Sequence, residues 1–410
     1  MHQEPAKLRT VLGWAAFLAC SWTWCIGMWL PVILARDYGP WAFMVFALPN
    51  CLGAAMMGVL LKSPGRSERI TELHPGACVA FSGVTCAFQW FFAAWLLTPG
   101  TPTGLLAPLA AVLLAGVCYA GLRGRGRVGV VSGTVYVASL ALLALWMFGT
   151  EAASPGPFVP ASIDAPGLAL LAPVMIFGFA LSPYLDLTFH RARRALPGDA
   201  GNSAFIIGFM VLFWLMIFGT RFYAEPTNAL AAGIGAALSP ALLAWPLLLH
   251  VGMQLGFTIA AHHTSVRVGP TGGRAGAGVL LLSAPLGVAA AVAAPHLEIG
   301  MFTGAEVVYR GFMGFYGLVF PAYVWLCVIP RSGAITRPSP RHVLVFVGAV
   351  LAAAPCFALG FLKDREEFLP IGLAIVLLAR LLIPATPAPQ PLRLLSNEPD
   401  PAHPDQGSLA

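Results

Sequence analysis

Charge is scarce in this sequence. Of its 410 residues only 10% are charged, while 58% are hydrophobic and the mean hydropathy is +0.79. Soluble domains carry about 25% charged residues, so this chain cannot cover a water-exposed surface of ordinary size. Its net charge of +6 lies in short loops between apolar segments, an arrangement typical of membrane topology. The scarcity predicts a protein surrounded by a lipid bilayer and excludes a nucleic-acid partner.

The sequence also lacks the motifs of metal and redox chemistry. None of its eight cysteines belongs to a CxxC pair, and all lie in apolar stretches where cysteine packs as a small hydrophobe. His262 and His263 are adjacent, so on a helix they point apart and make a poor metal site. We therefore predict no metal site, no cofactor and no catalytic residue, and expect that the protein is not an enzyme.

Long apolar runs are what the sequence has in abundance. A helix that crosses the hydrocarbon core needs about 20 apolar residues. Twelve stretches fit that length, at approximately 11–35, 40–61, 76–98, 103–122, 128–149, 166–190, 203–222, 239–262, 275–295, 302–330, 342–362 and 367–384. The expected fold class is an all-α polytopic membrane protein with about twelve transmembrane helices.

Lysine and arginine predict how these segments are oriented. With the N-terminus in the cytoplasm, eighteen of them fall on the inside and four in outside loops. Positive residues gather on the cytoplasmic side, so we expect both termini inside, in a bacterial inner membrane. The run from Val11 to Ala35 has no small-residue cleavage motif and predicts an uncleaved first span. The proline-rich stretch 385–410 cannot bury a core and predicts a disordered cytoplasmic tail.

The order of the segments is a second pattern. Five segments precede the long outside loop 150–165, five follow it, and two more end the chain. Segment six is interrupted around Gly178 to Pro183, and the short stretch 227–238 precedes segment eight. Segment one carries Ser21 and Thr23 near its middle. Short or Gly/Pro-interrupted spans at matching places of two halves indicate a binding site.

This layout resembles the transporters of the leucine-transporter fold, in the amino acid–polyamine–organocation superfamily, over roughly residues 10–330. The resemblance implies two inverted five-helix repeats, here 10–149 and 166–330, which enclose a site at the middle of the membrane. Two additional helices at 342–384 complete a single transmembrane domain, 1–384. The resemblance also implies that the first helix of each repeat is broken.

Ionisable residues inside a membrane segment are expensive and mark functional sites by default. Asp186 follows the interruption of segment six, near Ser182 and Tyr184, and is spaced by four from His190 and by eight from Arg194. One interpretation is a cation or proton site that opens inward, with Asp186 as the binding charge. The other is a salt bridge from Asp186 to Arg193 or Arg194 at the inner interface.

Two further polar groups stand out. Glu306 and Arg310 lie one helical turn apart in segment ten, which indicates an ion pair that serves as a gate or as a structural contact. His250, Gln254 and Thr258 form a polar stripe on segment eight. That stripe either lines a cavity or only joins neighbouring helices by hydrogen bonds.

The leading hypothesis is a secondary active transporter, an ion-coupled symporter or exchanger of a small solute. Its midplane site lies between broken segments one and six and segment eight, and either Na⁺ or H⁺ is the coupling ion. The candidate binding residues are Ser21, Thr23, Ser182, Tyr184, Asp186, His250, Gln254 and Thr258. One alternative is a membrane-embedded enzyme acting on a lipid-linked substrate, with His74 and the acidic run 364–367 as its loop residues. Another is a structural or sensory membrane protein that does not transport.

Overall fold

Almost every described residue of the chain is helical. The computed structural model describes residues 8–23, 25–39, 41–63, 65–97, 106–124, 126–149, 164–219, 245–268, 273–331 and 335–384. Strands are confined, within those ranges, to one antiparallel hairpin of β1 (Glu298–Ile299) and β2 (Phe302–Thr303). The predicted all-α fold class is confirmed.

Eight helical stretches among the described residues are long and apolar enough to cross a membrane. They are α3 (Ala42–Leu60), α5 (Pro75–Leu97), α7 (Val128–Gly149), α8 with η2 (Ala165–Leu185), α10 to α11 (Gly198–Phe218), α14 with η6 (Arg274–His296), α15 to η8 (Ala305–Val328) and α17 (Pro340–Lys363). A ninth is the bent pair α1 (Leu8–Trp22) and α2 (Cys25–Tyr38). The chain is therefore an integral membrane protein with transmembrane helices.

Several of these spans are composite. The span Gly198–Phe218 consists of α10 (Gly198–Ile206), the π-helical η3 (Ile207–Phe213) and α11 (Trp214–Phe218). The span Ala305–Val328 consists of α15 (Ala305–Gly314), η7 (Phe315–Val319), α16 (Phe320–Tyr323) and η8 (Val324–Val328). Short 3-10 turns are η6 (Ala294–His296), η9 (Glu366–Phe368) and η10 (Arg380–Leu382). Single π-helical turns are frequent at functional sites.

Three further helices lie where spans four, eight and twelve are predicted. They are not among the eight stretches that are long and apolar enough to cross a membrane. They are α6 (Leu106–Arg123), α13 (Trp245–Val268) and α18 (Leu369–Ala379). At 1.5 Å per residue α13 is about 36 Å long, and its polar stripe dilutes its apolar character. The count of twelve spans stays a prediction. The stretch 227–238, nearly all of the loop 150–165 and the tail 385–410 lie outside the described residues.

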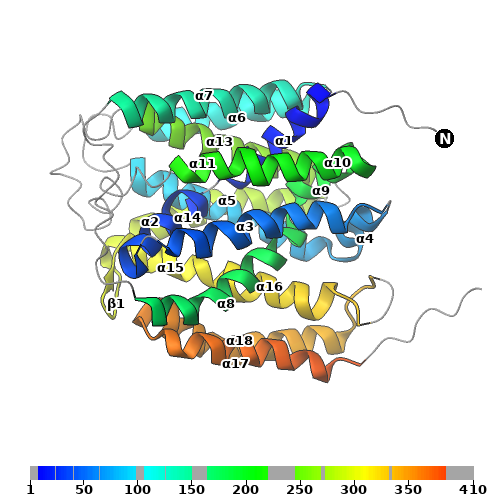
Figure 1. Ribbon diagram of the computed structural model, residues 1–410, viewed down its shortest axis with the longest axis vertical. Helices are drawn as coiled ribbons and strands as arrows, with labels where there is room; N and C mark the ends of the chain where they lie inside the picture. The colour runs from blue at the N-terminus through cyan, green and yellow to red at the C-terminus, as the bar shows by residue number, and fades with distance from the viewer. Residues whose placement is uncertain are drawn as a thin grey trace, which may run out of the picture.

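The helices lie side by side and cross Figure 1 in roughly the same direction. Helices α6 and α7 form one edge of the bundle and α17 and α18 the other. The amphipathic helix α4 (Arg66–Leu73) lies at the end opposite the β1 hairpin. The described chain begins with α1 and ends after α18 at the same end of the bundle.

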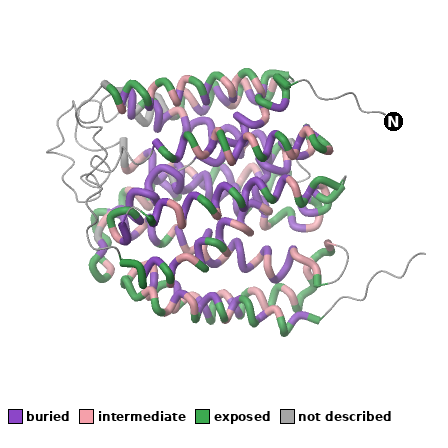
Figure 2. The backbone as a smooth tube through the Cα atoms, in the orientation of Figure 1, coloured by how far each residue is buried: buried purple, intermediate pink, exposed green. Residues whose placement is uncertain are grey.

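Burial separates a central layer from the lipid-facing helices. Figure 2 shows buried residues concentrated in the middle of the bundle and exposed ones along α7 and α17. In the most apolar stretch of α5, 72% of the residues are buried. In the corresponding stretches of α14 and α17, only 22% are buried. Large apolar side chains such as Leu281 and Leu344 are more than 70% exposed. Such surfaces need a non-aqueous surrounding, which in this chain is the bilayer.

Glycine brings two helices into close contact near the centre. A Cβ atom on Gly53 of α3 would lie 2.3 Å from the carbonyl oxygen of Phe179 in α8. Small residues at helix interfaces in membranes let backbones approach this closely. The contact holds α3 against α8 just before Ser182, where the helical run of segment six ends.

Candidate functional site

Segment six is interrupted at the predicted place. Helix α8 ends at Leu181, η2 (Ser182–Leu185) is a 3-10 turn, Asp186 is extended (φ −77°, ψ 111°), and α9 (Leu187–Ala195) continues the run. Pro183 has no backbone N–H to donate to the preceding turn, which weakens the helix at this point. The expectation that Gly178 also loosens the helix is wrong. Gly178 stays helical, and its missing side chain admits the carbonyl oxygen of Tyr316.

Segment one is interrupted as well. Helix α1 ends at Trp22, and α2 begins at Cys25 with a change of direction of 54°. The hydroxyl of Ser21 donates to Leu18 O (3.1 Å) and that of Thr23 to Ala19 O (2.8 Å). Hydroxyls that bond back to the preceding turn compete with the helix and bend it. The predicted polar residues of segment one therefore lie where its first half, α1, ends.

The two interruptions meet. The Thr188 hydroxyl of α9 lies 3.2 Å from the Ser21 hydroxyl of α1 and 2.7 Å from Asp186 Oδ1. The Trp22 ring is 4.9 Å from that of Phe189 in α9. Trp22 also donates its indole N–H to Asn50 Oδ1 on α3 (2.6 Å). Ser21 and Asp186 are thus brought together through Thr188, which sequence reasoning did not single out.

Asp186 caps α9 and has one oxygen left over. Its Oδ1 accepts the backbone N–H of Thr188 at 2.7 Å, an N-cap bond. Its Oδ2 is buried and has no hydrogen-bond partner among the described residues. The alternative salt bridge to Arg193 or Arg194 is not observed there. Arg193 donates to Gly198 O (2.7 Å) and Asn202 Oδ1 (3.1 Å), and the buried NH2 of Arg194 has no hydrogen-bond partner among the described residues. The described part of the chain offers Asp186 no ion pair.

Further polar groups surround the interruption. Ser182 donates to the carbonyl oxygen of Tyr316 in η7 (3.3 Å), and the Tyr316 hydroxyl lies 3.1 Å from that of Thr85 on α5. One turn along α5, Ser82 is hydrogen-bonded to Nδ1 of His262 on α13 (3.1 Å). The sequence indicated His262 only as a poor metal ligand. Its position was not predictable, because the partners are far apart in the chain.

The stripe on α13 faces other helices. Gln254 donates to the Ser139 hydroxyl of α7 (2.7 Å), and Thr258 donates to the carbonyl oxygen of Cys20 in α1 (3.3 Å). His250, Gln254 and Thr258 are fully buried. Gln254 and Thr258 therefore make interhelical hydrogen bonds, one of the two predicted roles, and the cavity-lining role of the stripe stays a prediction.

A cavity lies beside α8, on the side toward the end of the bundle where the β1 hairpin lies, and none of residues 182–188 lines it. It measures about 60 Å³ and lies between α2, α8 and α15. Gly178 and Tyr316 line it near the break, and Tyr38 and Arg310 line it at the far end. Most of its remaining lining is apolar.

Four charges at that far end form what we call the outer cluster: Arg36, Asp37, Glu306 and Arg310. The predicted pair is present, since Arg310 Nε lies 2.9 Å from Glu306 Oε1. Two residues at the end of α2 complete it. Arg36 NH2 lies 2.6 Å from Glu306 Oε1, and Arg310 NH2 lies 2.5 Å from Asp37 Oδ2. The cluster is neutral in sum and joins segment one to segment ten.

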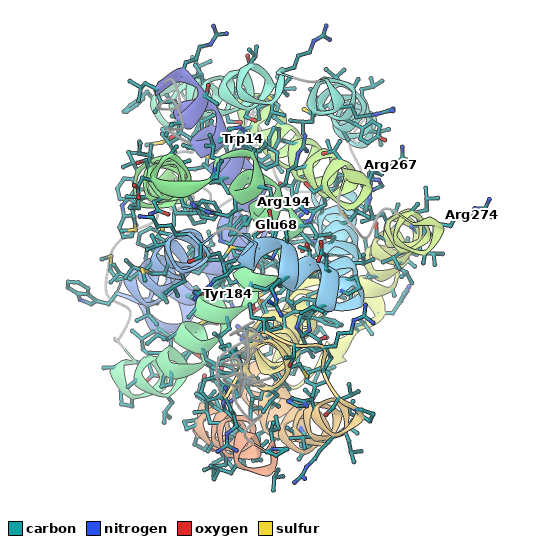
Figure 3. All side chains as sticks on the ribbon, turned by 90° about the vertical axis from the view of Figure 1, so that its right-hand side faces the viewer. Trp14, Glu68, Tyr184, Arg194, Arg267 and Arg274 are labelled. Atoms are coloured by element: carbon teal, nitrogen blue, oxygen red, sulfur yellow. The ribbon has the colours of Figure 1, made fainter. Side chains whose placement is uncertain are left out.

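The opposite end of the bundle is closed by α4. His190 of α9 is hydrogen-bonded through Nδ1 to the Ser67 hydroxyl of α4 and through Nε2 to Tyr184 O, each at 2.9 Å. Tyr184 thus contributes its carbonyl oxygen. Figure 3 looks onto this end and shows Glu68 of α4 next to Arg194 of α9 near the centre. We call the Ser67, His190 and Tyr184 contacts the inner clamp.

His74, between α4 and α5, belongs to the same end. Its Nδ1 lies 3.1 Å from the Tyr323 hydroxyl. Burial lowers the pKa of His74 to about 4, against a backbone interaction with Thr336 that raises it. The imidazole is therefore neutral at pH 7 and is committed to a contact between helices.

No group of three or more His, Cys, Asp or Glu residues that could hold a metal ion occurs among the described residues. Comparison with known protein families finds no match to the chain, and comparison with curated proteins finds none either.

Proposed function

We propose that this chain is a secondary active transporter that binds a small solute between the interruptions of segments one and six. Asp186 is its principal binding charge, and Ser21, Thr188 and Ser182 are the adjacent polar groups. The observation that carries the proposal is the buried, unpartnered Oδ2 of Asp186 where the two interruptions meet. Interrupted helices in a membrane supply backbone carbonyls and half-helix ends to ions and solutes.

Helix packing supports two inverted five-helix repeats with twelve spans. Helix α3 (segment two) packs on α8 (segment six). In the same way, η3 (segment seven) packs on α1 (segment one). Likewise α5 (segment three) packs on α14 (segment nine), and α13 (segment eight) packs on α6 (segment four). If each segment of the first repeat is exchanged with the segment five places later, the contact between two and six becomes that between seven and one. The contact between three and nine becomes that between eight and four, as two equivalent repeats require. The two helices at 342–384 then stand outside the repeats.

The outer cluster and the inner clamp serve as the two gates in this proposal. The outer cluster joins the ends of α2 and α15 above the cavity, and the clamp fixes α9 to α4 below the interruption. Both termini lie in the cytoplasm of a bacterium, which the distribution of arginine and lysine supports. The enzyme alternative gains no support, because His74 is committed to Tyr323.

The test is uptake by proteoliposomes that contain the purified full chain. A panel of amino acids, amines, nucleobases and small carboxylates is offered under Na⁺ and under H⁺ gradients. Asp186→Asn should abolish the uptake of whichever solute the native chain takes up, while the protein still folds and inserts. Asp164→Asn is the matched control, because Asp164 caps α8 in the same segment but is exposed. Full uptake by Asp186→Asn would remove Asp186 from the mechanism.

A further inference from the structure

We infer that the coupling ion is a proton and that Asp186 carries it, so that this carboxyl is neutral while both gates are closed. The inference rests on the proposed function and names the ion that drives it. It concerns one atom, Asp186 Oδ2, which has no hydrogen-bond partner among the described residues. The other carboxyl oxygen, Oδ1, accepts two hydrogen bonds from Thr188.

The first argument is the cost of charge. Asp186 is fully buried in the middle of the bundle. An ionised carboxylate without a counter-charge is costly to bury, and in practice such a group takes up a proton instead. A protonated Oδ2 becomes an O–H donor, while Oδ1 keeps both of the bonds it accepts from Thr188. The absence of a counter-charge therefore favours the neutral acid, whose O–H has no acceptor among the described residues while the gates are closed.

The second argument is the set of charges that face Asp186. The titratable or charged side chains on the elements around it include Glu68 of α4, Cys78 and Cys86 of α5, Tyr184 of η2, His190, Arg191, Arg193 and Arg194 of α9, His262 of α13 and Tyr316 of η7. Among these, His190 uses both ring nitrogens elsewhere. Arg191 donates to the Thr264 hydroxyl of α13 and to Leu122 O. Arg193 donates to α10 and its preceding turn, and Arg194 lies beside Glu68 at the bundle end. None of them forms an ion pair with Asp186 in the described structure.

The third argument distinguishes a proton from sodium. Hard cations are held by several oxygens that converge on one point. Here the hydroxyl proton of Thr188 goes to Asp186 Oδ1, with the Ser21 hydroxyl 3.2 Å away, and Ser21 donates its own proton to Leu18 O. Between segments one and eight, Thr258 donates directly to the carbonyl oxygen of Cys20. In the described structure these oxygens are engaged in separate hydrogen bonds and do not converge on one point, so they form no cage around a metal ion, and the coupling ion assigned to Asp186 is a proton.

Infrared difference spectroscopy of the full chain in lipid tests the assignment without a known solute. At pH 7 the native protein and Asp164→Asn should both show the carbonyl stretch of a buried protonated carboxylic acid. Asp186→Asn should lack it. Absence of that band from the native protein would overturn the inference. So would its disappearance on adding NaCl, but not choline chloride, at constant pH.

Uptake separates this inference from the proposed function. Uptake in proteoliposomes should follow an imposed H⁺ gradient, be abolished by a proton ionophore, and be unaffected by replacing Na⁺ with choline. Uptake that needs Na⁺ would overturn proton coupling and leave the transporter standing. Failure to take up any solute of the panel under any gradient would overturn the proposed function, and the coupling assignment with it.

Discussion

The outer cluster and Asp186 are two buried ionisable sites with opposite surroundings. In the outer cluster every charge has an oppositely charged neighbour within 3 Å, and the four sum to zero. At the meeting point of the interruptions, Asp186 has hydrogen bonds to one oxygen and, among the described residues, no counter-charge. The outer cluster lies at the rim of the bundle, and Asp186 lies near its middle.

The contrast separates ionisable groups that hold helices together from the single carboxyl that we propose binds. A pair compensates its own desolvation, and removing one partner leaves the other charge uncompensated. A single buried acid gives no such stability and persists in a membrane for a function. Stability should therefore depend on the outer cluster, and transport on Asp186.

The largest expected effect on stability comes from breaking the outer cluster. Glu306→Gln leaves Arg36 and Arg310 with only Asp37 between them, so the free energy of unfolding in mixed micelles should fall by about 3 kcal/mol. This is the lower end of the range for broken buried pairs, because Arg36 is about a third exposed. The control is Glu367→Gln, whose partner Arg365 is exposed; it should change stability by less than about 1 kcal/mol. Equal losses in both variants would contradict the comparison.

The inner clamp provides a neutral counterpart to the outer cluster. Ser67→Ala removes the partner of His190 Nδ1 and leaves a buried ring nitrogen unsatisfied, which should cost about 1–3 kcal/mol. Because no ion pair is involved, this loss should be the same at low and at high salt. Ser63→Ala, at an exposed serine before α4, is the control and should have no measurable effect.

A smaller, pH-dependent effect is expected next to the outer cluster. Burial, and then the charge of Glu366, raise the pKa of Asp364 above its ordinary value. The folded state therefore holds this proton more tightly than the unfolded chain does. Its contribution to stability is full below the unfolded pKa and is lost as the pH rises through the folded pKa. Asp364→Asn should raise the Tm by up to about 2 °C at pH 8 and leave it unchanged at pH 3. A gain confined to acid pH would reverse the sign and contradict the assignment.

The smallest effect on stability is expected at Asp186 itself. Asparagine caps helices as well as aspartate does, and Asp186→Asn places no new charge in the bundle. Its free energy of unfolding should stay within about 0.5 kcal/mol of the native value. A loss as large as that of Glu306→Gln would show that Asp186 is a structural charge, and the contrast between the two regions would fail.

Local chemistry was predictable from the sequence, and long-range partners were not. Pro183 and Asp186 indicate where a helix ends and the next begins, because ring geometry and capping act over a few residues. The spacing of Glu306 and Arg310 predicts their pair for the same reason. Arg36 joins Glu306 across 270 residues of sequence and Thr188 reaches Ser21 across 167, so only the packing of segments reveals these contacts. The stripe of His250, Gln254 and Thr258 was predicted as a stripe, but the helices it faces depend on the fold.

The most direct test of the central claim is hydrogen exchange across residues 182–188, with and without the transported solute. The claim is that the meeting interruptions of segments one and six form the binding site. Amides there should exchange faster than those of 170–178 in α8, because 3-10 and extended backbone lacks the full helical ladder. Added solute should slow their exchange in the native chain and not in Asp186→Asn. Slow exchange at 182–188 without solute, or solute protection confined to other segments, would contradict the account.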